Sequence, residues 1–87
     1  MGSEEEDRQL EHERALQTME QLRQSVEKGY REMQETGDDG PMRKAQMRFK
    51  VRMKALQASH PDACKEWQSG NARFLQAIEQ GRNPILC

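Results

Sequence analysis

The strongest constraint on the fold of this chain is one long stretch without a helix breaker. From Ser3 to Thr36 there is no proline and a single glycine, and good helix formers (Glu, Gln, Arg, Leu and Met) dominate. Ser3 with Glu6 three residues later is typical of a capping box, and the acids of the first turn suit the positive end of the helix dipole. We therefore predict one long helix over about residues 4–36.

Apolar residues form a stripe along this predicted helix. They recur at spacings of three and four, so they share one side while the charged residues take the other. The stripe consists of Leu16, Met19, Leu22, Val26, Tyr30 and Met33. It is narrow and nearly heptad, a pattern typical of coiled-coil packing against another helix.

Two shorter helices are predicted after a break at residues 36–41, where two glycines and two aspartates favour a turn and Pro41 suits the start of a helix. The first spans about residues 41–58 and ends because Pro61 disfavours helical geometry at His60. The second spans about 61–80, and an apolar tail covers 82–87. Their expected core residues are Met42, Ala45, Phe49, Met53, Leu56, Ala63, Cys64, Trp67, Phe74, Leu75 and Ile78. The predicted fold is all-α, one small domain over 1–87 folded as a helical hairpin or three-helix bundle.

The composition predicts a small core that needs a partner. Hydrophobic residues make up 33% of the 87, charged residues another 33%, and the net charge is only −1. Chains this short bury little apolar surface on their own, so we expect stabilisation by another protein or by a second copy. No run approaches the roughly 20 apolar residues that a membrane span needs. Without a secretory signal, and with Cys64 and Cys87 too few for a disulfide scaffold, we expect reduced thiols and a cytoplasmic location.

Catalysis is not expected from this sequence. His12 and His60 are the only imidazoles, and neither stands in a pattern that would activate a nucleophile. His60 and Cys64 lie four residues apart, but a structural zinc ion needs four ligands and no second close pair completes the set. No glycine-rich phosphate loop follows a strand. We predict a protein without an active site, metal or cofactor.

The predicted second helix carries the clearest functional signal. Between residues 43 and 54 it holds six cations and no acid; the cations are Arg43, Lys44, Arg48, Lys50, Arg52 and Lys54. Such a helix is typical of a surface for a partner protein, a membrane or a nucleic acid. The cations could instead pair with the first helix, because residues 4–39 contain twelve acids against five bases. Both readings stay open at this stage.

From these patterns we expect a small non-catalytic binding module, such as an adaptor, chaperone or regulator, that associates through its helices with a larger protein or with itself. The expected partner-binding residues are Leu16, Met19, Leu22, Val26, Arg48, Phe49, Arg52 and Met53. The alternative is a nucleic-acid-binding regulator that uses the six cations, and strong salt dependence would distinguish it.

The tripeptide His60-Pro61-Asp62 after a basic helix resembles the loop of the J-domain family of Hsp70 co-chaperones. The resemblance covers residues 43–62. It implies that the tripeptide would stimulate an Hsp70 ATPase while the cations at 48, 50, 52 and 54 dock on that protein. The chain departs from the family pattern at Ala63, where a lysine is usual, and in the length of its first helix. A helix end followed at once by a helix start also accounts for the tripeptide.

Overall fold

The structure is a computed structural model that describes the backbone of residues 3–86 and the side chains of residues 4–85. This part of the chain forms four α-helices and one short 3-10 helix, without a strand; they are α1 (Ser3–Thr36), α2 (Gly40–Ser59), α3 (Pro61–Gly70), α4 (Ala72–Glu79) and η1 (Pro84–Leu86). The predictions of an all-α fold and of a long first helix are confirmed. The expected capping side chain of Ser3, the thiol of Cys87 and the apolar side chain of Leu86 lie outside the described part.

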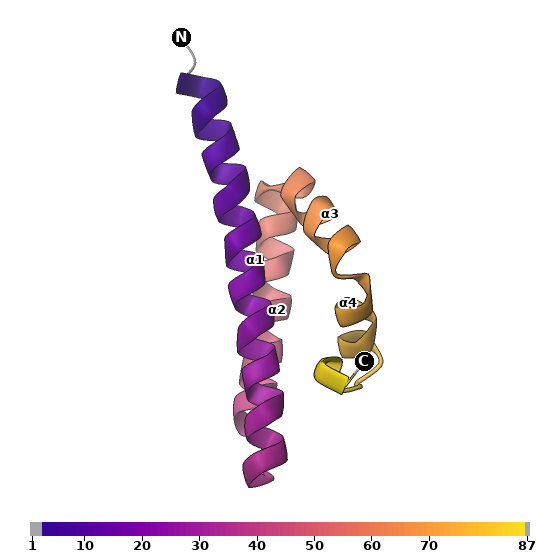
Figure 1. Cartoon of the computed structure of the whole chain (residues 1–87). Coiled ribbons are helices and arrows are strands. Elements are labelled where there is room, and N and C mark those ends of the chain that lie inside the picture. The colour runs from indigo at the N-terminus through magenta and orange to yellow at the C-terminus, as the bar shows by residue number, and fades with distance from the viewer. Residues whose placement is uncertain (1–2, 87) are drawn as a thin grey trace.

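The helices form an elongated molecule of 54 × 19 × 18 Å. α1 and α2 run antiparallel as a hairpin, and α3 turns back from the end of α2 so that α4 and η1 follow along the side (Figure 1). α1 has 34 residues and α2 has 20. Consequently the N-terminal part of α1 projects past the end of α2 at which α3 begins (Figure 1).

The hairpin turn is built from small and polar residues. Gly37 takes a positive φ of 77°, which L side chains rarely adopt, and its N–H donates to the Met33 carbonyl at 2.8 Å, ending α1. The Asp38 carboxylate then accepts the Gly40 N–H at 3.0 Å. Pro41 follows in the first turn of α2, where a missing N–H costs nothing. The break predicted at residues 36–41 is therefore present.

The core contains every apolar residue predicted for it. Buried or packed against the buried cluster are Leu16, Met19, Leu22, Val26, Tyr30, Met33, Met42, Ala45, Phe49, Met53, Leu56, Ala63, Cys64, Trp67, Phe74, Leu75 and Ile78. Ala15 and Ala77 are also buried, and Ile85 of η1 packs against the cluster. The single core therefore runs from α1 through α2 to the C-terminal helices.

The prediction of one helix over 61–80 is wrong. The helix is broken at Asn71, whose backbone leaves helical geometry with φ −128° and ψ 31°. Ser69, Gly70 and Asn71 are poor helix formers. The Asn71 side-chain amide donates to the Trp67 carbonyl at 2.9 Å and takes up an acceptor at the end of α3. The break lets α4 change direction and bring Phe74 onto the core.

Three aromatic rings join the last three long elements. Phe49 of α2 lies 5.9 Å from Trp67 of α3 and 5.6 Å from Phe74 of α4, measured between ring centroids, and Trp67 lies 6.2 Å from Phe74. The rings are tilted or edge-to-face, which is the arrangement that aromatic pairs favour. This triangle holds α3 and α4 against the hairpin.

Candidate protein-binding surface

The apolar residues predicted to bind a partner lie in the core of this chain. Met19 and Val26 are 0% exposed, Leu22, Phe49 and Met53 are buried, and Leu16 is partly buried against them. These six side chains pack α1 against α2. In the folded hairpin, a partner could not contact the five buried ones without opening the packing.

The six cations of α2, in contrast, all lie on the surface. Arg43 pairs with Asp39 at the start of the helix, at 2.8 Å. No ion pair in the described part of the chain links any of the six to an acid of α1, and no hydrogen bond or ion pair engages the side chains of Lys44, Arg48, Lys50, Arg52 or Lys54. Internal pairing with α1, one of the two readings of the sequence, is absent from the described contacts.

Two large apolar side chains stand among these cations. Met47 is 70% exposed and Val51 is 63% exposed, and their spacing of four residues puts both on the side of α2 opposite Phe49 and Met53. We call this surface the outer face of α2 and define it as Lys44, Met47, Arg48, Lys50, Val51 and Lys54. A surface hollow of about 320 Å³ lies along one edge of it, lined by Arg43, Gln46, Met47, Lys50 and Val51.

The apolar stripe predicted along residues 41–58 did not include Met47 or Val51. Their signal was available, because they lie about half a helical turn away from the stripe that contains Phe49 and Met53. An apolar pair off the core stripe, with cations on both sides, indicates a second apolar face.

The other strongly charged surface is the projecting part of α1. We call residues 4–14 the acidic overhang. It contains six acids, Glu4, Glu5, Glu6, Asp7, Glu11 and Glu13, against two arginines. Every residue in it is exposed except the half-buried His12, whose Nε2 lies 2.6 Å from the Glu66 carboxylate of α3.

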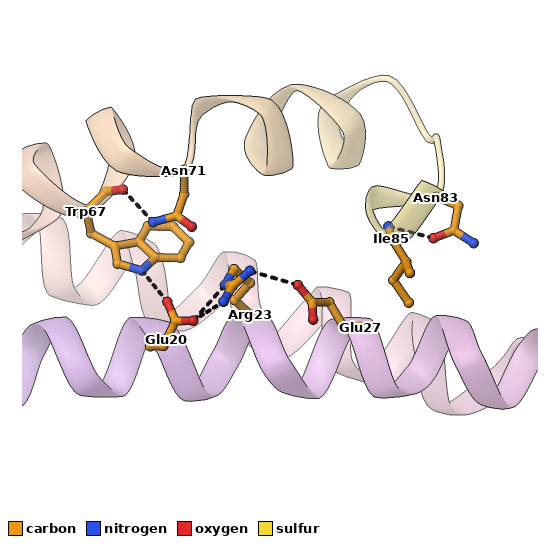
Figure 2. A network of polar contacts seen from close by, with 7 residues as sticks. All are labelled: Glu20, Arg23, Glu27, Trp67, Asn71, Asn83 and Ile85. Carbon is orange, nitrogen blue, oxygen red and sulfur yellow. Dashed lines mark hydrogen bonds and ion pairs between the residues drawn. The ribbon is translucent and has the colours of Figure 1, made fainter. Parts of the chain in front are cut away.

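A polar network fixes α3 against α1 (Figure 2). The Trp67 indole N–H donates to the Glu20 carboxylate at 3.2 Å, and the Arg23 guanidinium donates to both Glu20 and Glu27, the latter at 2.9 Å. The hydrogen bond from Arg23 lowers the pKa of Glu20, partly opposed by burial, and the same bond raises the pKa of Arg23. The network holds Trp67 of the aromatic triangle against α1.

Cys64, which stands four residues after His60, lies in the buried cluster. Burial raises the pKa of the Cys64 thiol, and this cysteine is free and 1% exposed. Within the described residues, no group of three or more His, Cys, Asp or Glu side chains is placed to hold a metal ion. No described helix is both long and apolar enough to cross a membrane.

The tripeptide His60-Pro61-Asp62 forms the junction between α2 and α3. His60 caps both helices, Pro61 opens α3, and Asp62 lies in its first turn. The Ser59 hydroxyl lies 2.9 Å from Nδ1 of His60. A surface hollow of about 260 Å³ adjoins this junction, lined by Arg8, Glu11, His12, Ser59, His60, Pro61, Asp62 and Ala63.

No known protein family, no curated protein and no solved structure matches this chain. The resemblance to the J-domain loop therefore rests on the tripeptide and the basic helix before it.

Proposed function

We propose that this chain is a non-catalytic protein-binding module, of the adaptor or regulator kind, that contacts an acidic partner through the outer face of α2. One observation carries the proposal. Met47 and Val51 are the most exposed large apolar side chains described, and they lie side by side among four cations that make no hydrogen bond or ion pair within the described part of the chain.

An exposed apolar pair among cations suits a protein partner. Single exposed apolar residues are ordinary on protein surfaces, but Met47 and Val51 are adjacent on one helical face. Methionine adapts its shape to different contact surfaces, and arginine and methionine are enriched at protein interfaces. The surrounding cations would steer an acidic surface towards the face, while the apolar pair would be removed from water on contact.

Nucleic acid is the competing partner for the same cations. Phosphate binding would use Arg48, Lys50 and Lys54 and would lose affinity steeply as salt rises, because bound counterions are released. The net charge of −1 is unfavourable for a polyanion ligand. The apolar pair gains nothing from a phosphate backbone, so its contribution to binding separates the two cases.

Affinity capture from a cell extract with immobilised protein tests the proposal. The extract is used with and without nuclease treatment, and the bait is the unaltered chain, a Met47→Ser/Val51→Ser variant, or an Arg48→Glu/Lys54→Glu variant. The control bait is Lys65→Glu/Arg73→Glu, which makes the same charge change at exposed positions of α3 and α4.

We expect a protein that is retained by the unaltered and control baits and lost from both outer-face baits. Retention that ends with nuclease treatment would assign the face to nucleic acid. Equal retention by all four baits would remove the outer face as the binding surface.

A further inference from the structure

The two strongly charged surfaces of the chain cannot neutralise each other within one molecule. The acidic overhang carries six acids and two arginines, a net charge of −4, and residues 43–54 carry six cations and no acid, a net charge of +6. Because α1 and α2 are antiparallel, the overhang projects past the C-terminal end of α2, whereas the cations lie along the body of α2 (Figure 1). Both surfaces are exposed.

The overhang presents acid in every direction. Glu4, Glu5, Glu6 and Asp7 are consecutive, and successive helical residues are rotated by about 100°, so these four sweep almost the whole circumference. Whichever side of this first turn meets another surface is therefore negative. The outer face of α2 is the surface of opposite charge on the same chain.

We propose that a second copy of this chain is the partner of the outer face of α2, with the acidic overhang of each copy lying along the outer face of the other. This inference rests on the proposed function and names the partner for the same face. The two segments match in length: residues 4–14 span about 16 Å and residues 43–54 about 18 Å at 1.5 Å per residue.

The difference in helix length makes the contact reciprocal. α1 is longer than α2 by 14 residues, the difference between 34 and 20. In an antiparallel pair related by a twofold axis, each α1 covers its own α2 with the part after residue 14 and the partner's α2 with the overhang. The arrangement uses one contact twice and closes as a dimer rather than a fibre.

The contact is mainly ionic and exposed at its edges, so it is expected to be weak and sensitive to salt. This salt sensitivity distinguishes the dimer from one held by a purely apolar interface. Met47 and Val51 would be covered by Leu10 of the overhang, which is 47% exposed.

A charge-swap experiment tests the proposal. The first variant carries Glu5→Lys and Glu11→Lys in the overhang, and the second carries Arg48→Glu and Lys54→Glu on the outer face. The control carries Glu35→Lys and Glu79→Lys, which make the same change as the first variant at exposed positions outside both surfaces. Sedimentation velocity at 50 and 500 mM salt measures association, and circular dichroism reports whether each variant remains helical.

We expect the unaltered chain and the control to form dimers at 50 mM salt, with association at least tenfold weaker at 500 mM. Each swapped variant alone should associate at least tenfold more weakly than the unaltered chain. An equimolar mixture of the two variants should recover dimers in part, because a mixed dimer keeps one unaltered contact, between the overhang of the second variant and the outer face of the first. The mixture also serves as a control for misfolding, because a misfolded variant could not recover association.

An unaltered chain that stays monomeric at 50 mM salt, or swapped variants that fail to associate with each other, would overturn the inference. The proposed function is tested separately by the capture experiment. A chain that stays monomeric but loses its captured protein when Met47 and Val51 are replaced keeps the proposed function and loses only the second copy as partner.

Discussion

Gly29 of α1 and Met42 of α2 mark a close approach of the two hairpin helices: a Cβ atom added to Gly29 would stand 2.6 Å from the Met42 Cα. That distance is far below ordinary van der Waals contact. Gly29 is the only glycine inside the long helix and is buried. The missing side chain therefore allows α1 and α2 to pack closely next to their turn.

Gly29→Ala should destabilise the hairpin. In an isolated helix the change would be favourable by about 1 kcal/mol, because glycine is a poor helix former. Here the added methyl group must push two backbones apart, and we expect a net loss on the order of 1–3 kcal/mol. The control is Gly70→Ala, where an added Cβ meets nothing within 4 Å. Urea unfolding followed by circular dichroism measures both, and equal stability of the two variants would contradict the close approach.

The hydrogen bonds of Glu20 predict a pH dependence of stability. The Arg23 hydrogen bond lowers the folded-state pKa of Glu20 below its ordinary value of 4.5, and the Trp67 N–H adds to this effect. A lowered folded pKa means that the stabilisation is complete above the unfolded pKa. It is lost as the pH falls through the folded pKa. We therefore expect the fold to weaken as the pH falls below the ordinary value of 4.5 and this carboxylate becomes protonated.

Glu20→Gln should remove part of that dependence and lower stability at pH 7. Urea unfolding at several pH values, followed by the fluorescence of Trp67, gives the measurement, because Trp67 is the single tryptophan and touches Glu20 directly. Glu13→Gln serves as the control, since Glu13 is exposed and makes no hydrogen bond or ion pair. If Glu20→Gln and Glu13→Gln show the same pH profile, the network does not act as described.

Phe49 and Val51 should respond very differently to truncation, although they are two residues apart on α2. Phe49 is 4% exposed and contacts both other rings of the aromatic triangle, so Phe49→Ala should cost about 3–5 kcal/mol. Val51 is 63% exposed, so Val51→Ala should change stability by no more than about 0.5 kcal/mol. Thermal melts of the two variants measure both changes in stability. A large loss with Val51→Ala would mean that the outer face is covered by packing that the monomer does not show.

Helical periodicity was sufficient to predict the core residues, but it predicted neither the helix break at Asn71 nor the exposure of Met47 and Val51. Spacings of three and four identified Met19, Val26 and Phe49 because burial of an apolar stripe is the main requirement of a small helical fold. The break at Asn71 was missed because apolar residues continue in helical phase on both sides of it. The local signal in Ser69-Gly70-Asn71 was therefore outweighed. Periodicity also could not show that Met47 and Val51 are left uncovered, because that depends on where α3 and α4 pack.

Whether the charges of α1 and α2 form ion pairs could not be predicted from the sequence, for a different reason. Counting acids on one helix and cations on the other predicts attraction, but ion pairing requires side chains that face each other. The described ion pairs of α1 join Arg23 to Glu20 and Glu27 within the helix. A further pair joins His12 of α1 to Glu66 of α3. No described ion pair links the α2 cations to an acid of α1, but Arg52 lines a hollow with Thr18 of α1, so the effect of these cations on stability needs a direct test.

Arg48→Glu combined with Arg52→Glu should leave the free energy of unfolding within about 0.5 kcal/mol of the unaltered value, because neither arginine makes an ion pair in the described chain. The two lie four residues apart on one helix, so reversing both exchanges one like-charge neighbour pair for another. Arg23→Glu gives the contrast. It breaks ion pairs with Glu20 and Glu27 and should cost about 1 kcal/mol or more.

Adding Glu27→Lys to the α2 double variant distinguishes internal pairing from a free outer surface. If Glu27 attracted the α2 cations, a lysine there would restore stability once those cations had become glutamates. Because the Glu27 carboxylate instead accepts a hydrogen bond from Arg23 at 2.9 Å, the lysine removes that bond and places two cations four residues apart. We therefore expect the triple variant to be less stable than the double variant in urea unfolding. A gain in stability would show that α1 and α2 do pair their charges, and it would leave the α2 cations without the freedom that partner binding requires.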